Sequence, residues 1–203
     1  MFENFSIFLI ATVTLNLTPG PDMMYVLARS VGQGRKAGIV SVLGGSTGRL
    51  LHTFAAAFGL SALLLSSPVA FDVIKYAGAI YLVYLGVRAL IEREALAAVA
   101  EIEQSSLRRI YGQGFLTNAL NPTVALFFLA FLPQFVDAGR GAVVGQMVLL
   151  GLIFTASATF WSTSIALLAG SVGNWLRRHP GAARAQRKVM GCVFIALGLR
   201  LAF

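Results

Sequence analysis

Long apolar runs separated by short polar stretches are the dominant pattern of this 203-residue chain. A transmembrane helix needs about 20 mostly apolar residues. By that measure the sequence predicts six spans, Phe5–Ala28, Ile39–Leu65, Val69–Ile91, Gly114–Val136, Ala142–Gly173 and Ala185–Phe203. The expected fold is an all-α integral membrane protein, lying in the lipid bilayer as a single transmembrane domain.

Composition agrees with this pattern and argues against the soluble classes. Hydrophobic residues make up 57% of the chain and charged residues 12%, which is about half the charged fraction of a soluble domain. The net charge is +8, but the basic residues gather at the ends of apolar runs and form no patch with interleaved aromatic residues. We therefore expect no nucleic-acid partner.

The positions of the basic residues predict how the spans are oriented. Arginine and lysine concentrate in the first, third and fifth loops, as with Arg35 and Lys36 or Arg108 and Arg109. Cytoplasmic loops carry the excess of basic residues in membrane proteins, so these loops are expected in the cytoplasm and both termini outside. The third loop, Glu92–Tyr111, is expected to be a cytoplasmic linker between two halves.

The two halves, residues 1–91 and residues 112–203, show weak internal similarity. The third and sixth spans share two motifs, Lys75-Tyr76-Ala77-Gly78 with Leu85-Gly86-Val87-Arg88 and Lys188-Val189-Met190-Gly191 with Leu197-Gly198-Leu199-Arg200. Prolines also interrupt both the first and the fourth span. Because each half has an odd number of spans, equivalent halves must be antiparallel, and inverted repeats with broken helices are typical of transporters. We expect two inverted three-helix repeats with broken helices 1 and 4.

The proline-rich stretch of the first span is the strongest candidate for a binding site. Asn16-Leu17-Thr18-Pro19-Gly20-Pro21-Asp22 cannot continue a smooth helix, because its two prolines lack backbone donors. In lipid, unpaired backbone groups are tolerated only beside protein or a water-filled cavity. Asp22 is expected to bind a substrate ammonium or a proton. It would also suit the N-cap of a half-helix that starts at Met23.

The second span adds two candidate residues, Arg49 and His52. An arginine deep in an apolar helix needs a partner, so we expect an Asp22–Arg49 pair or an Arg49 that faces a water-filled cavity. The alternative is that Arg49 faces lipid and extends to the headgroups. His52 is a candidate proton carrier or a hydrogen-bonded packing residue. The run Gly44–Gly48 matches the G-x-S-x-G pattern of serine hydrolases, but it lies in an apolar helix without the required strand–turn–helix context.

The sequence argues against two other classes of function and leaves a third one open. An intramembrane thiol-redox enzyme needs a cysteine pair, and Cys192 is the single cysteine, so no enzyme activity is expected. A metal exporter needs thiolate or imidazole ligands, and with two histidines in the chain we expect no metal site. An uncoupled channel has no sequence feature that separates it from a coupled transporter. The oligomeric state also stays open, with a homodimer as one arrangement.

Several segments resemble signatures of the lysine exporter family (LysE/RhtB), the bacterial amino-acid exporters. Asn16–Asp22 resembles the first-span signature, Gly114–Pro122 followed by Ala125–Phe135 resembles the fourth-span signature, and Tyr76–Gly86 resembles the third span. The match covers nearly the whole chain. The resemblance implies six spans in the bacterial inner membrane, export of amino acids or related small metabolites, coupling to protons and no bound cofactor.

The resemblance also assigns site residues to this chain. The family's motif residues correspond to Asn16, Thr18, Pro19, Gly20, Pro21, Asp22, Asn118, Asn121 and Pro122. Two positions depart from the pattern, because the family often has lysine at Thr123 and usually has an uncharged residue at Arg49. We expect Arg49 to supply the missing cation from the second span, and the breaks at Pro19 and Pro122 to approach each other.

Overall fold

The structure is a computed structural model that describes residues 5–18, 20–60, 68–91, 104–137, 139, 141–178 and 180–202. These residues form α1 (Phe5–Leu17), α2 (Pro21–Gln33), α3 (Arg35–Ala55), the π-helical turn η1 (Ala56–Leu60), α5 (Pro68–Ile91), α6 (Leu107–Ala119), α7 (Pro122–Leu126), the π-helical turn η2 (Phe127–Phe131), the 3-10 turn η3 (Leu132–Phe135), α8 (Val143–Arg178) and α9 (Pro180–Ala202). The described ranges thus hold eight α-helices and no strand, because the first and fourth predicted spans each contain two helices.

The helix boundaries follow the predicted spans closely for α5 and α8 and depart from them elsewhere. Residues 61–65, at the end of the second predicted span, and most of the predicted linker, residues 92–103, lie outside the described ranges. The linker is shorter than predicted, because α6 already begins at Leu107. Ser106 is the N-cap of this helix and its side chain accepts a hydrogen bond from the Arg109 N–H, so the helix starts in a polar segment ahead of the apolar run.

The apolar helices are those of a membrane protein. Asp72–Ile91 and Val143–Ala169 are long and apolar enough to cross a bilayer, and Leu107–Ala119 with Pro122–Phe135 forms a third candidate that is bent by 48°. Large apolar side chains lie on the surface, including Ile80 at 72% exposure. A surface of this kind suits lipid. Six complete membrane crossings stay a prediction.

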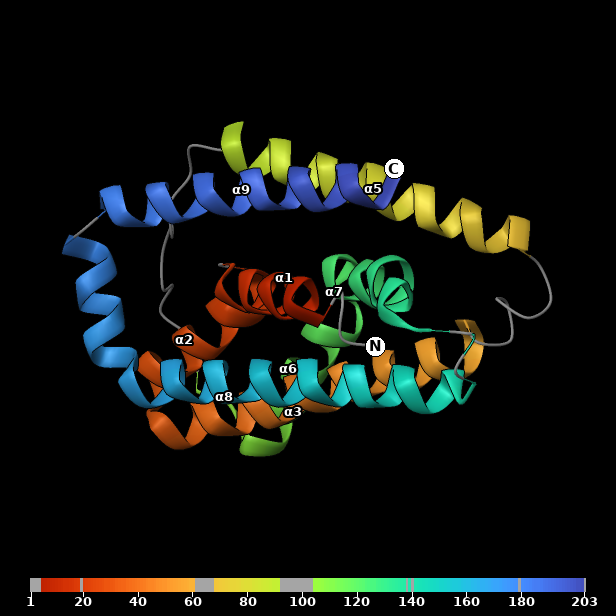
Figure 1. The fold of residues 1–203 in the computed structure, drawn as a ribbon. Coiled ribbons are helices and arrows are strands. Elements are labelled where there is room, and N and C mark those ends of the chain that lie inside the picture. Colours follow the sequence, from red (N-terminus) through yellow and green to blue (C-terminus); the bar gives the residue numbers. More distant parts are fainter. Residues whose placement is uncertain are drawn as a thin grey trace.

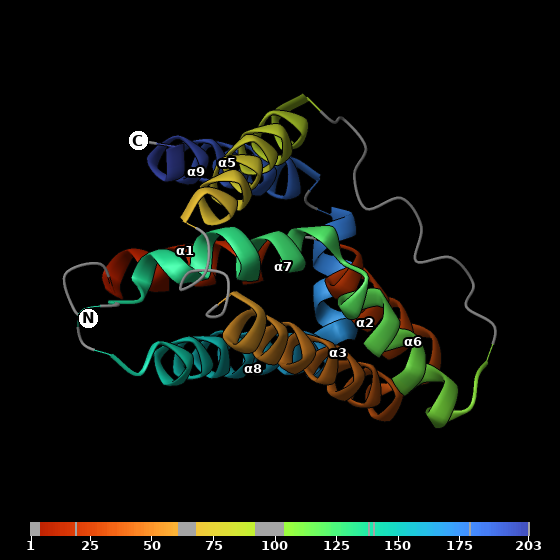
Figure 2. The ribbon, with the colours of Figure 1, turned by 90° about the vertical axis from the view of Figure 1, so that its right-hand side faces the viewer.

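The helices lie in three tiers that both ribbon views show (Figures 1 and 2). The α5–α9 pair forms one side, α1 and α7 run through the middle, and α3 and α8 lie on the opposite side with α2 and α6. Apolar side chains from the middle tier and α8 form the main core, in which Phe8, Phe128, Phe131 and Phe154 are fully buried. A core of this kind fixes α1 and α7 between the two outer tiers.

The shared glycines of the third and sixth predicted spans bring α5 and α9 into contact. A Cβ atom at Gly86 would lie 2.6 Å from the Gly191 carbonyl oxygen, and one at Gly198 would lie 2.8 Å from the Ala79 carbonyl oxygen. The residue numbers rise along α5 as they fall along α9, so the two helices are antiparallel. Small residues allow such close backbone approach between helices.

Glycines have the same role between α3 and α6. A Cβ atom at Gly44 would clash with the Tyr111 carbonyl oxygen, and one at Gly48 would lie 2.9 Å from the Asn118 Cβ atom. On α6, a Cβ atom at Gly114 would lie 2.5 Å from the Ser41 carbonyl oxygen. The small residues of the second predicted span therefore permit close helix packing and bring the end of α6 against α3.

Candidate functional site

The first helix break lies between α1 and α2. Thr18 ends α1, with its hydroxyl donating to the Thr14 carbonyl oxygen at 2.8 Å, and Pro19 lies outside the described residues. The N-cap of α2 is Gly20, in an extended conformation and with no side-chain cap hydrogen bond, and Pro21 follows at the first helical position. The alternative interpretation of Asp22 as an N-cap is therefore wrong. The carboxylate lies in the first turn, where the helix dipole favours negative charge, and it remains available for another partner.

The second helix break lies between α6 and α7. Asn121 is the N-cap of α7, and its side chain accepts a hydrogen bond from the Thr123 N–H at 3.0 Å, with Pro122 at the first helical position. Asn118, near the end of α6, is fully buried. Neither the oxygen nor the nitrogen of its amide has a hydrogen-bond partner among the residues that the structure describes. The two asparagines therefore differ: Asn121 completes a helix, whereas the Asn118 side chain is unsatisfied.

One cavity of about 290 Å³ collects residues from both breaks. The predicted site residues that line it are Asn16, Thr18, Gly20, Pro21, Asp22, Arg49, Asn118 and Asn121. The two breaks therefore approach each other, as expected. Segments that lie about 100 residues apart in the sequence meet here because α1 and α7 run side by side through the middle tier (Figure 2).

An ion pair between Asp22 and Arg49 lies at this cavity. The Arg49 Nη1 atom donates to the Asp22 Oδ2 atom at 2.9 Å. The Arg49 side chain is 3% exposed and the Asp22 side chain is 18% exposed. The predicted pair is thus confirmed, and the alternative of a lipid-facing Arg49 is wrong. Gly45 makes room for the pair, because a Cβ atom there would lie 2.8 Å from the Asp22 Oδ1 atom.

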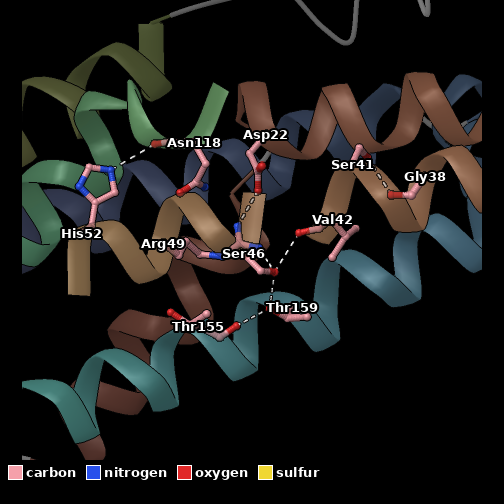
Figure 3. Close-up of polar contacts among 10 residues, drawn as sticks. All are labelled: Asp22, Gly38, Ser41, Val42, Ser46, Arg49, His52, Asn118, Thr155 and Thr159. Carbon is pink, nitrogen blue, oxygen red and sulfur yellow. Dashed lines mark hydrogen bonds and ion pairs between the residues drawn. The ribbon is translucent and has the colours of Figure 1, made fainter. Parts of the chain in front are cut away.

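Hydroxyl groups from α3 and α8 hold the other side of the guanidinium (Figure 3). The Arg49 Nη2 atom donates to the Ser46 hydroxyl at 3.2 Å, and this hydroxyl lies 2.7 Å from that of Thr159. Thr159 in turn donates to the Thr155 carbonyl oxygen at 2.7 Å. Ser46 therefore orients Arg49 within helix α3, and the serine-hydrolase interpretation of Gly44–Gly48 has no structural support. The Arg49 Nε atom has no partner among the described residues.

Two predicted site residues are placed away from the cavity lining. The His52 Nε2 atom lies 3.2 Å from the Asn118 backbone carbonyl oxygen, within hydrogen-bonding distance. The His52 ring stacks on Phe128, with ring centroids 6.0 Å apart. Neither His52 nor Pro122 lines the cavity. The contacts of His52 match its interpretation as a hydrogen-bonded packing residue, which anchors the end of α6 to α3.

Sequence reasoning missed several residues that line the cavity. Arg88 on α5 and Ser162 on α8 contribute polar groups, and Phe154 and Phe194 contribute aromatic walls. Arg88 ends the motif that the third and sixth spans share, so the repeat could have identified it. The phenylalanines carry no such signal, because an aromatic residue in an apolar helix is usually a packing residue.

The arrangement defines a class of protein. Apolar helices of membrane type, with proline interruptions in two of the predicted spans, meet at a cavity that holds a buried ion pair. Broken helices around a central polar site are the arrangement of a solute transporter. A sequence comparison identifies the family: its model, described as LysE type translocator, matches residues 13–203, and the chain belongs to this family.

The curated relatives match the chain along nearly their whole length. The uncharacterized membrane protein YrhP of Bacillus subtilis is 30% identical over 193 residues, with 91% of each chain covered. The homoserine/homoserine lactone efflux protein of Salmonella typhimurium is 27% identical, covering 99% of this chain and 97% of the relative. The leucine efflux protein of the same organism is also 27% identical, with 98% and 94% covered. No solved structure matches significantly.

Proposed function

We propose that this protein exports amino acids or related small metabolites from the bacterial cytoplasm by proton antiport, with the cavity at the two breaks as the solute site. The observation that carries the proposal is the Asp22–Arg49 ion pair at that cavity. Relatives named as efflux proteins for homoserine and leucine support the substrate class. The protein would lie in the inner membrane with both termini outside.

The proposed architecture has six crossings in two inverted three-helix repeats. The first repeat would comprise α1 with α2, then α3 and α5, and the second would comprise α6 with α7, then α8 and α9. Two observations support it. The equivalent helices α5 and α9 are antiparallel, and the equivalent helices α3 and α8 are joined by the hydrogen bond between Ser46 and Thr159.

The two charges of the ion pair are complementary to the ammonium and carboxylate groups of an amino acid. The Asp22 carboxylate can accept hydrogen bonds from a substrate ammonium, and the Arg49 guanidinium can bind a carboxylate through two parallel hydrogen bonds. The Arg49 Nε atom, which has no partner in the described ranges, adds a donor on the edge of the guanidinium that Asp22 does not use. Exchanging the internal pair for the two charges of a zwitterion keeps each buried charge compensated.

Coupling to protons follows from competition for Asp22. Without a solute, the ion pair joins α2 to α3 and holds the carrier in one conformation. A proton on Asp22 breaks this pair, and so does a zwitterion that takes both partners. Only the protonated and the substrate-bound carrier would then change conformation, so that a proton entering the cell drives a substrate out.

Proteoliposomes test this proposal directly. Vesicles loaded with radiolabelled leucine or homoserine should lose label faster when a pH gradient drives protons inward through the protein. Asp22→Asn should abolish this acceleration while the protein still inserts into the membrane, because an amide cannot carry the proton. Asp137→Asn, at an aspartate that does not line the cavity, is the matched control and should behave as wild type.

Two results would contradict the proposal. Normal pH-driven export by Asp22→Asn would remove the carboxylate from the coupling mechanism. Flux that neither saturates with substrate nor responds to the pH gradient would instead identify an uncoupled channel.

A further inference from the structure

We propose that the cavity selects amino acids with neutral, largely apolar side chains, and that the Asn118 amide binds the ammonium and carboxylate groups of the substrate. This inference rests on the proposed function and narrows its substrate class. Three features of the cavity carry it: an unsatisfied buried amide, the balance of charged side chains, and the apolar walls.

The Asn118 amide is buried and has no hydrogen bond within the part of the chain that the structure describes. Its side chain is fully buried and lines the cavity, yet neither polar atom has a partner among the described residues. Buried polar groups in proteins are nearly always hydrogen-bonded, and an exception calls for an explanation. A ligand in the cavity supplies one. An amide is both donor and acceptor, so it suits a ligand that offers a carboxylate and an ammonium on neighbouring atoms.

The position of Asn118 is fixed by contacts that do not involve its amide. Its backbone carbonyl oxygen lies 3.2 Å from the Nε2 atom of His52, and its Cβ atom packs against Gly48 of α3. Figure 3 shows the amide on the same side of α3 as the Asp22–Arg49 pair. The backbone is therefore held in place, while the buried amide, in the wall of the same cavity as the two charges, has no hydrogen bond among the described residues to hold it.

The charges at the cavity disfavour a cationic side chain. Among the described residues that line it, the charged ones are Asp22, Arg49 and Arg88. Asp22 is the sole carboxylate of this set and is already paired with Arg49. Once Asp22 binds the substrate's main-chain ammonium, a second ammonium on the substrate would meet no further carboxylate among the described lining residues.

The walls of the cavity suit an apolar side chain. Leu85, Phe154 and Phe194 line it from three helices. Phe154 is fixed in place, because its ring stacks on Phe127 with centroids 4.7 Å apart and is 1% exposed. The volume of about 290 Å³ lies at the lower end of the range for small-molecule sites, so the cavity accommodates a small amino acid.

A matched pair of competitors tests the selectivity. Norleucine and lysine share the same six-carbon chain, and lysine carries an ammonium group on the terminal carbon, where norleucine carries only hydrogen. In counterflow of labelled leucine through proteoliposomes, norleucine should compete at least about tenfold better than lysine. Equal competition by the two would overturn the selectivity and leave the proposed function intact. Failure of every amino acid to exchange with label would overturn the proposed function itself.

A matched pair of variants tests the role of Asn118. Asn118→Leu should raise the KM for leucine about 10- to 100-fold, the change expected for losing hydrogen bonds to charged groups. Its melting temperature in detergent should not fall, because an apolar side chain replaces a buried amide that has no partner. Asn121→Leu should show the opposite stability result and lower the melting temperature, because it removes the cap of α7.

Substrate analogues add a readout that a structural role would not change. The wild type should prefer leucine over 4-methylpentanoate, which lacks the ammonium, and over 3-methylbutylamine, which lacks the carboxylate. In Asn118→Leu both preferences should shrink. A normal KM in Asn118→Leu, or unchanged preferences together with a lower melting temperature, would make Asn118 a structural residue and overturn the assignment.

Discussion

Replacing Arg49 with leucine tests whether the central ion pair binds substrate or only stabilises the fold. The change removes the cation that lies 2.9 Å from the Asp22 carboxylate, whose side chain is 18% exposed. Removing one partner of a buried ion pair costs about 3–5 kcal/mol. We expect a loss near the lower end for Arg49→Leu, because Asp22 borders the cavity and keeps some contact with water. The melting temperature in detergent should fall accordingly.

A double-mutant cycle separates the pair from its surroundings. Asp22→Asn leaves the Arg49 guanidinium, 3% exposed, without its carboxylate, and should also destabilise the protein. The double variant Asp22→Asn with Arg49→Leu removes both charges, so its loss should be smaller than the sum of the single losses. The coupling energy should be about 1–3 kcal/mol, as for other residues in direct contact.

Transport should respond differently from stability across the same variants. Arg49→Leu should lower kcat/KM about 10- to 100-fold, because a carboxylate loses its charged hydrogen-bond donor. The double variant should recover stability without recovering transport. Arg49→Leu with Thr123→Lys should recover part of the transport, since Thr123 lines the same cavity. Full transport by Arg49→Leu, or stability losses that simply add, would refute this reasoning.

Three further predictions concern the surroundings of the pair and the topology. Gly45→Ala should impair transport, because its methyl group would lie 2.8 Å from the Asp22 Oδ1 atom. The control Gly59→Ala should not, because no described atom lies within 4 Å of the added carbon. Equal transport rates for the two variants would contradict a role for the close contact at Gly45. His52→Gln should retain pH-driven export, because His52 packs outside the cavity lining, and loss of the pH response alone would restore its role as a proton carrier. Alkaline phosphatase fused to the C-terminus should be active, since the basic loops place both termini outside, and an inactive fusion with normal transport would reverse the topology.

Much of the candidate site could be predicted from the sequence because its signals are local. A proline cannot continue a helix that approaches it from the N-terminal side, so the breaks inside the two apolar runs follow from Pro21 and Pro122 without knowledge of the fold. A buried charge needs a partner, so Arg49 and Asp22 could be paired from their depth in neighbouring spans. The structure contains both breaks and the ion pair.

Other features depended on contacts between distant segments. Asn118 and Asn121 belong to the same motif, yet the Asn121 side chain accepts a hydrogen bond from the Thr123 N–H, whereas the Asn118 side chain has no hydrogen-bond partner among the described residues. The difference comes from the surroundings of each side chain. His52 and Arg49 lie on the same helix, yet one contacts α6 and the other contacts α2. Residue type and spacing do not distinguish the two members of each pair.

The amino-acid sequence by itself determined the class of fold, the interruptions of two helices and the charges available at the breaks, because apolar run length, proline and charge act locally. The tertiary structure alone decided which side chains share a cavity. Glycine contacts set how closely α3 approaches α6 and α5 approaches α9. Arg88 on α5 and Phe154 on α8 line the cavity, whereas His52 packs beside it. Such distances depend on how whole helices pack together, which no short stretch of sequence specifies.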